Sequence, residues 1–379
     1  MGFRIVVLWT DILLFAVLLS VIGLVLWGHR REPMRRAWNY IKQSRLTVAS
    51  IVILMIYGVI ALLDSVHYQR QLTNTIYSTE VHYSPETHSL FDVLVAPLGQ
   101  HKEKTYSAPF AKHLLTKESR INSQGQLERY YPPTQYWHFL GTDKVGNDVL
   151  YEALKSIRTG VIIGTITTLV MLPFAILLGI VAGYFGGWID DVIQYIYTTL
   201  SSIPGVLLIA ATILALQVFI ANNSELFPNL ALRADARLLA LCIILGITSW
   251  TSLCRMLRGE TLKIREIDYI QAARALGAGH WRIIWRHILP NVMHIVLIAI
   301  VLDFSALVLA EAVLSYVGVG VDPTSFSWGT MINSARLELA REPIVWWPLV
   351  AAFIFMFTLV LAANIFADRV REALDPRLH

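Results

Sequence analysis

Long, almost uncharged apolar runs dominate this sequence and limit what the chain can fold into. Seven of them approach or exceed the roughly 20 residues that an α-helix needs to cross a bilayer. They lie at about 5–27, 46–64, 160–184, 193–220, 238–257, 291–318 and 346–367. Only 15% of the residues are charged, against about 25% in a typical soluble domain. The sequence therefore predicts an all-α polytopic membrane protein with about seven transmembrane helices.

The distribution of basic residues predicts which loops face the cytoplasm. Residues 28–45 hold six Lys or Arg and a single acid, and cytoplasmic loops carry such an excess. Alternation of the spans then places the N-terminus outside and the C-terminus in the cytoplasm. The stretch from Arg255 to Asn291 falls inside, and its seven basic residues against three acids agree with that side.

The runs divide the chain into four parts. Residues 1–45 form a transmembrane helix and a basic cytoplasmic linker, and residues 46–64 form a second helix. Residues 65–158 form an extracytoplasmic subdomain of about 90 residues, and residues 159–379 form the helical core with a cytoplasmic loop at 259–290. The subdomain holds six of the eleven histidines. Their spacings do not fit pairs of metal ligands, so we expect no metal site.

No motif of a catalytic or nucleotide-binding site occurs in the sequence. There is no GxxxxGK[ST] phosphate-binding loop, no HExxH and no GxSxG. We therefore expect no catalytic residues, no cofactor and no enzyme activity on this chain. The net charge of +4 is explained by basic cytoplasmic loops and calls for no nucleic-acid partner. Any work that the protein does must draw on an ion gradient or on a partner.

The cytoplasmic loop at 259–290 is long and basic for a connection between two spans. Gly277 and Gly279 interrupt a helix-friendly stretch, which predicts a helix to about Ala275, a turn at 277–279 and then a second helix. Pro290 lacks a backbone donor and marks the start of the next span.

Both predicted helices of this loop offer a surface for contact. Ala272 and Ala273 are small enough to let another surface approach closely. The second helix is amphipathic, with Arg282 and Arg286 beside isoleucines. Such a segment either lies on anionic lipid or docks into a groove on a protein. A short helix pair on a tight turn favours docking.

The segment "QAARALGAGHWRIIWRHILPN" closely resembles the EAA loop of ABC importer permeases. That loop has Glu-Ala-Ala, a glycine four residues after the second alanine and a downstream Leu-Pro. These places are taken here by Gln271, Ala272, Ala273, Gly277, Leu289 and Pro290. Gln271 departs from the family's glutamate, so an acidic contact from that position is not expected.

Further motifs resemble one branch of these permeases, the C-type subunits of dipeptide, oligopeptide and nickel importers. They follow the family order: "LGTDKVGNDVL", "GYFGGWIDD", "SSIPGVLL", "EAVLSYVGVG", "SWGTMI" and "REALDPRLH". The resemblance covers about residues 138–379. The usual C-type permease has six spans, so residues 1–45 are an addition.

The resemblance implies a permease subunit of an ATP-driven, binding-protein-dependent importer in the bacterial inner membrane. Its partners would be a B-type permease, two ATP-binding subunits that hold ATP and Mg, an extracytoplasmic substrate-binding protein and membrane lipid. Peptide is the expected cargo, with nickel or another small solute as the alternative. The loop that couples to the ATPases would use the following residues: Gln271, Ala272, Ala273, Arg274, Gly277, Arg282, Arg286, Leu289 and Pro290.

Candidate pore or gate residues lie in the span at 291–318. Asp303 and Glu311 are eight residues apart, so they share roughly one helix face, and Ser315 follows one turn later. Acids inside a membrane are costly and face a cavity or partner helices. Asp303 would either line the pore or make a buried structural bond, whereas Glu311 is expected to fix helix packing near an outer gate. Asp11 in the first span is expected near the outer interface.

Two other functions remain open from the residues alone. An ion-coupled secondary transporter could use Asp303 and Glu311, but it predicts inverted repeats that the sequence lacks. A membrane-anchored sensor could bind a ligand in residues 65–158, but it leaves the core motifs unexplained. Trp328, Trp346 and Trp347 lie in or next to an outside segment and are expected as anchors at the membrane interface.

Overall fold

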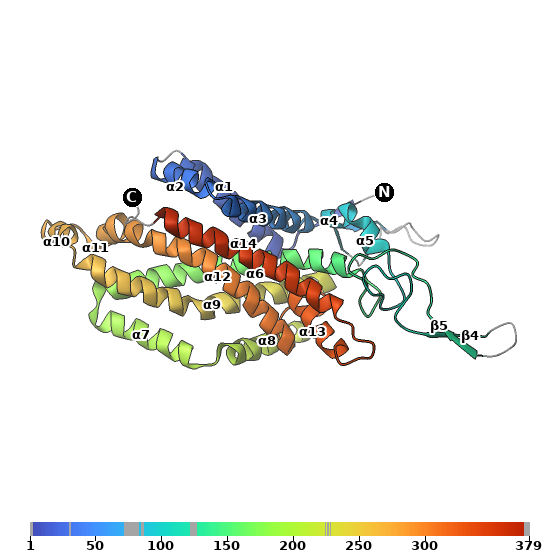
Figure 1. Ribbon diagram of the computed structural model, residues 1–379. Helices are drawn as coiled ribbons and strands as arrows, with labels where there is room; N and C mark the ends of the chain where they lie inside the picture. Colours follow the sequence, from blue (N-terminus) through green and yellow to red (C-terminus); the bar gives the residue numbers. More distant parts are fainter. Residues whose placement is uncertain are drawn as a thin grey trace.

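Long helices run side by side in an elongated bundle in the computed structural model (Figure 1). It describes residues 3–29, 32–71, 83–84, 87–121, 127–223, 225, 227 and 229–374. The helices are α1 (Trp9–His29), α2 (Glu32–Lys42), α3 (Arg45–Asp64), α4 (Leu90–Leu94), α5 (Ala96–Gln100), α6 (Val149–Phe185), α7 (Gly187–Ser202), α8 (Gly205–Asn222), α9 (Leu230–Arg265), α10 (Asp268–Ala275), α11 (His280–Ile283), the π-helix η1 (Ile284–Ile288), α12 (Leu289–Val317), α13 (Trp328–Glu338) and α14 (Trp347–Leu374).

Within the described ranges, five helices are long and apolar enough to cross a membrane. They are α3, α6, α8, the continuous helix from His280 to Val317, and α14. The predicted span 5–27 starts too early, because Phe3–Val6 form a strand, β1, and α1 begins at Trp9. The predicted span 238–257 lies in α9. Neither helix meets that criterion over the described residues. α9 nevertheless carries 17 consecutive uncharged residues between Arg237 and Arg255. The chain is an all-α polytopic membrane protein, as predicted, and about seven helices make up its spans.

The predicted span 193–220 is two helices, not one. α7 ends at Ser202, and Ile203 adopts an extended backbone with φ −85° and ψ 130°. The cause is Pro204, which has no N–H to donate and disfavours helical geometry in the residue before it. α8 then starts at Gly205 and supplies the apolar span. The sequence-based prediction missed this break because the apolar run continues through it.

The centre of the bundle is the close contact between α6 and α9. Glycines on α6 allow it: a Cβ on Gly179 would lie 2.8 Å from the carbonyl oxygen of Cys254, and one on Gly183 would lie 2.6 Å from Cβ of Thr261. Small residues four apart on one helix face are a common way to bring membrane helices together. α6 is also longer than predicted, because Asp148 caps it and it begins at Val149 instead of residue 160.

The two ends of the bundle differ in what they carry (Figure 1). At one end, the sheet end, β1 (Phe3–Val6), β2 (His67–Arg70) and β3 (His88–Ser89) form an antiparallel sheet. A separate hairpin of β4 (Glu118–Ile121) and β5 (Leu127–Tyr130) projects beyond it. At the other end, the loop end, lie α2, α10, α11 and the C-terminus. Segments predicted to share a side of the membrane therefore lie at the same end.

The N-terminal addition is fastened to the core at the sheet end. β1 pairs with β2 in the register Phe3↔Arg70. Asp11 lies 2.6 Å from the guanidinium of Arg158 on α6 and 2.9 Å from His67. The expectation that Asp11 lies near the outer interface omitted these partners, because they come from residues far away in the sequence.

A buried histidine joins the segment before α6 to the cap of that helix. His138 Nδ1 lies 2.7 Å from Asp148, whose other oxygen accepts the backbone N–H of Leu150 at 2.8 Å. On its other side, His138 Nε2 lies 3.7 Å from Glu103. All three side chains are nearly inaccessible. The contacts attach the loop segment firmly to the start of α6.

Two tryptophans expected at the membrane interface belong to the core instead. Trp328 is 1% exposed and donates to the carbonyl of Ala153 at 3.1 Å. Trp347 is buried and donates to the carbonyl of Thr142 at 2.9 Å. Only Trp346 of the three is exposed. The prediction was wrong for Trp328 and Trp347, because composition does not reveal a carbonyl that an indole can reach.

Candidate functional site

The loop between α9 and α12 forms the predicted helix–turn–helix. α10 ends at Ala275, and Gly277 follows with a φ of +80°, a left-handed conformation that favours glycine. The N–H of Ala278 bonds the carbonyl of Ala273 at 3.0 Å, and the N–H of Gly277 bonds that of Arg274 at 3.0 Å. These bonds satisfy the last carbonyls of α10, as in a Schellman cap. The chain then turns directly into α11.

One face of α10 is anchored and the other is free. Ile270 is 2% exposed and belongs to the apolar cluster below the loop. Gln271 and Ala272 are exposed on other sides of the helix, and Arg274, one turn after Ile270, is exposed as well. Leu276 at the tip is 88% exposed. Its side chain therefore makes almost no contact within the chain and is available to a partner.

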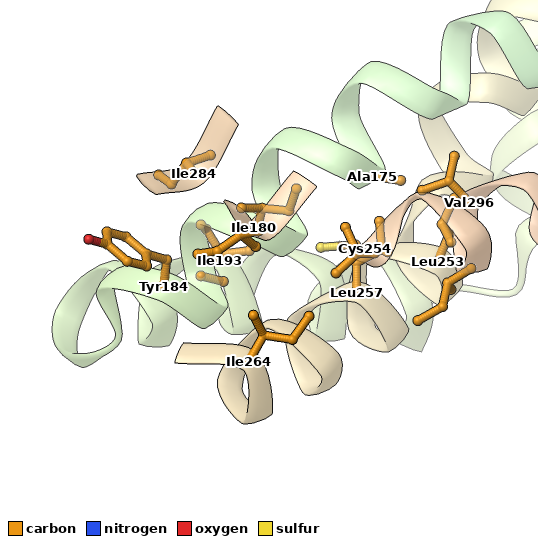
Figure 2. Close-up of a cluster of buried hydrophobic side chains, with 14 of the residues drawn as sticks. Ala175, Ile180, Tyr184, Ile193, Leu253, Cys254, Leu257, Ile264, Ile284 and Val296 are labelled. Atoms are coloured by element: carbon orange, nitrogen blue, oxygen red, sulfur yellow. The ribbon is translucent and has the colours of Figure 1, made fainter. Parts of the chain in front are cut away.

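The underside of the loop is packed into the core of the bundle (Figure 2). Ile283, Ile284 and Ile288 are buried there. Figure 2 shows Ile284 above Ile180 and Ile193, with Ile264 on the far side of the same cluster. The cluster joins seven elements: α6, α7, α9, α10, α11, η1 and α12. A force on the loop is therefore passed to several helices at once.

Polar contacts hold the same region together. Tyr184 at the end of α6 lies 2.9 Å from Nδ1 of His280 in α11. Arg258 on α9 donates two hydrogen bonds to Asp190 on α7, at 2.5 and 2.6 Å. Hydrogen bonding from Arg258 holds the pKa of Asp190 below its ordinary value. Asp190, in the first turn of α7, thus ties α7 to α9.

The remaining predicted loop residues lie along the same structure. Gln271 donates to the backbone carbonyl of Glu266 at 3.2 Å, so its amide is used within the loop. Arg282 and Arg286 are exposed on the second helix, and Pro290 is exposed in the first turn of α12. Leu289 is half-buried and packs against the cluster below the loop. The structure brings all nine predicted residues into one segment.

Sequence reasoning missed three exposed apolar residues of this segment. They are Leu276, Trp281 and Trp285, and the two tryptophans are each 59% exposed. For Leu276 a signal was available: it directly precedes the turn glycine, where the chain lies farthest from its own core. Trp281 and Trp285 line a shallow apolar recess with Ile176 and Ile180 of α6.

The three candidate pore or gate residues on α12 fall into two environments. Glu311 is 1% exposed and accepts the hydroxyl of Ser315 at 2.6 Å. If Gly329 of α13 carried a Cβ, that atom would lie 2.9 Å from the Glu311 carboxylate. Glu311 and Ser315 therefore fill the contact between α12 and α13. Asp303 lies two turns away and half-buried, and it does not join them.

A bundle of membrane helices with a helix–turn–helix loop exposed at one end is the architecture of a membrane permease. Residues 175–379 match the family model of binding-protein-dependent transport system inner membrane components. The match spans more than half of the chain, and the chain belongs to this family. The ABC importer permease predicted from the sequence motifs is thereby confirmed.

Several curated relatives are similar to this chain. A glutathione transport system permease protein of Pectobacterium atrosepticum is 31% identical over 64% of this chain and 73% of its own length. An oligopeptide transport system permease protein of Mycobacterium bovis is 33% identical over 65% of this chain and 77% of its own. A dipeptide transport system permease protein of Bacillus subtilis is 29% identical over 67% and 73%. The protein is a multi-pass inner-membrane permease.

Proposed function

We propose that this chain is the C-type permease subunit of an ATP-driven importer of peptides. The observation that carries the proposal is the loop at 259–290, exposed on α10 and packed into the helix bundle through Ile283, Ile284 and Ile288. Such a loop can receive motion from a soluble partner and pass it to the membrane helices. Peptide as cargo is supported by the relatives, which are named for dipeptide, oligopeptide and glutathione transport.

The proposed assembly contains a binding protein, as the family description implies, and separate ATP-binding subunits, because this sequence has no phosphate-binding loop motif. A B-type permease pairs with this chain, and two ATP-binding subunits bind ATP and Mg and hydrolyse the ATP. An extracytoplasmic binding protein delivers the substrate. This chain has no catalytic residue and holds no cofactor in that assembly. Its loop end faces the cytoplasm, so the N-terminus and the sheet end lie outside.

Transport then proceeds by alternating access. Closure of the ATPase dimer displaces α10 and its tip at Leu276. Because the buried side of the loop shares one cluster with α6, α7, α9 and α12, these helices move as a packed unit. Hinge and shear motions of packed helices are a common form of such switching. Glu311 and Ser315 hold α12 against α13 during this movement and so belong to the outer gate.

The test is transport by the purified assembly in proteoliposomes. We expect ATP-binding subunits to co-purify with this chain, and peptide uptake to stop when ATP is depleted. Uptake by the chain alone that survives ATP depletion would identify an ion-coupled transporter and overturn the proposal. Uptake of nickel ions without uptake of any peptide would support an ATP-driven importer but change its cargo from peptide to nickel.

A further inference from the structure

Asp303 is a carboxylate at the middle of a membrane-spanning helix. It is the central residue of α12 (Leu289–Val317), about 21 Å from either end at 1.5 Å per residue. The helix around it is strongly apolar. An ionised side chain at this depth is costly and is retained where it faces a water-filled cavity or a partner charge.

The described part of the chain offers Asp303 no partner. No hydrogen bond or ion pair reaches its carboxylate from the described residues, and the residue is half-buried. The ion pairs that stabilise this chain lie elsewhere. Asp11–Arg158 and Asp64–Lys155 are at the sheet end, and Asp190–Arg258 is toward the loop end. The described residues therefore leave the Asp303 carboxylate open to a partner charge or donor from another molecule.

The surface around Asp303 leaves part of the side chain accessible, since the residue is half-buried. Of the residues one turn away on the same face, Ala299 and Ala306 are small, whereas Ile300 and Leu307 are large. Beside this face runs an exposed apolar stripe: Leu302, Leu309 and Val313. Asp303 thus lies at the edge of an apolar surface, near the middle of α12.

We propose that Asp303 lines the substrate path and binds the ammonium group of the cargo, such as the amino terminus of a peptide. This inference rests on the proposed function. An ammonium offers three donors and one positive charge to a carboxylate that receives neither from the described residues of its own chain. In a low-dielectric path such a contact offsets the cost of desolvating the cargo's charge, and a single contact is weak enough to be released.

The experiment compares two cargoes and four forms of the complete transporter in proteoliposomes. Alanyl-alanine carries the ammonium, and lactoyl-alanine replaces it with a hydroxyl of similar size. The forms are wild type, Asp303→Asn, Asp303→Glu and, as a matched control, Asp368→Asn, which removes the same charge from an exposed position on α14. The same binding protein serves all four forms. Its own selectivity therefore cancels when the ratio of kcat/KM for the two cargoes is compared between a variant and wild type.

We expect Asp303→Asn to lower kcat/KM for alanyl-alanine about tenfold or more and to change lactoyl-alanine less than about twofold. Asp303→Glu retains most of the preference for the ammonium, and Asp368→Asn matches wild type. Equal losses for both cargoes, or no loss, overturn the inference and leave the proposed function intact. Dissociation of the Asn variant from the partner permease also overturns it, because Asp303 would then pair with that subunit. If the wild-type assembly imports no peptide, the proposed function itself is contradicted.

Discussion

Lys155 holds two carboxylates at once at the sheet end of the bundle. Its ammonium lies 2.7 Å from Asp64 on α3 and 2.9 Å from Asp92 on α4. The side chains of Lys155 and Asp64 are almost fully buried. A buried pair of this kind is strongly destabilised when one partner is lost, because the other charge remains without compensation. Three separate elements therefore depend on one lysine.

The ionisation of Asp92 makes this attachment sensitive to acid. Burial alone would raise the pKa of Asp92, but the charge of Lys155 and the N–H of Ser89 outweigh it and hold the pKa below its ordinary value. A depressed pKa stabilises the fold above the unfolded value of about 3.9, and this stabilisation is lost as the pH falls through the folded value. We expect the protection factors of the α4 amides against hydrogen exchange, corrected for the intrinsic rate at each pH, to fall as the pH drops below about 4. In Asp92→Asn these protection factors are already low at neutral pH, whereas Glu118→Gln, in an exposed pair with Lys104, changes nothing.

Arg258 has the corresponding role toward the loop end. Its two bonds to Asp190 hold α7 against α9, and Cys254 lies buried one turn away in the apolar cluster. We expect Arg258→Gln to loosen α7 and to raise the rate at which a maleimide labels Cys254, by about tenfold for a loss near 1.4 kcal/mol. Cys242 provides an internal control, since it is buried in a different cluster. Equal labelling rates at Cys254 in wild type and variant would show that the pair contributes nothing.

At the scale of elements, the exposed tip after α10 allows a defect in docking to be distinguished from a defect in folding. Leu276 is exposed, so replacing it removes no contact within the chain. We expect Leu276→Asp to leave the amount of protein in the membrane unchanged and to reduce ATP-driven uptake at least tenfold, because an acid replaces the apolar tip at the ATPase surface. Leu276→Met keeps the apolar surface and retains uptake.

The matched control for that variant lies at the other end of the bundle. Leu337 on α13 is 71% exposed, and Leu337→Asp makes the same chemical change far from the loop. We expect it to retain ATP-driven uptake. Full uptake by Leu276→Asp would contradict docking through the tip.

For the whole molecule, the two ends must lie on opposite sides of the membrane. Ile5 in β1 is 74% exposed at the sheet end, and Leu276 is exposed at the loop end. We expect Ile5→Cys to react with a membrane-impermeant maleimide in intact cells, and Leu276→Cys to react only after permeabilisation. The native cysteines, Cys242 and Cys254, are buried and give a low background. The reverse pattern would invert the proposed orientation.

Sequence reasoning reached the helical class and the loop because both depend on local signals. Apolar runs define the spans, and Gly277 ends the first helix of the loop. Pro290, predicted to mark the start of the next span, lies within the continuous helix from His280 to Val317. It failed where the deciding contact is distant in sequence. The partner of Asp11 is 147 residues away, and the carbonyl that accepts from Trp328 is 175 residues away. It also passed over Pro204, whose effect on the backbone is local but is hidden within an apolar run.

Asp235 on α9 accepts hydrogen bonds from the backbone N–H groups of Trp9 and Thr10, at 2.9 and 3.4 Å, and from the hydroxyl of Thr10. It therefore satisfies free donors in the first turn of α1, a task that a neighbouring residue performs in most helices. This arrangement sets an order for biogenesis. When Trp9 is added to the growing chain, Asp235 is still 226 residues from being made. At about 5–20 residues per second, the wait is roughly 10 to 45 seconds. During that time the first turn of α1 lacks this acceptor, and the contact can form only once the start of α9 has been made.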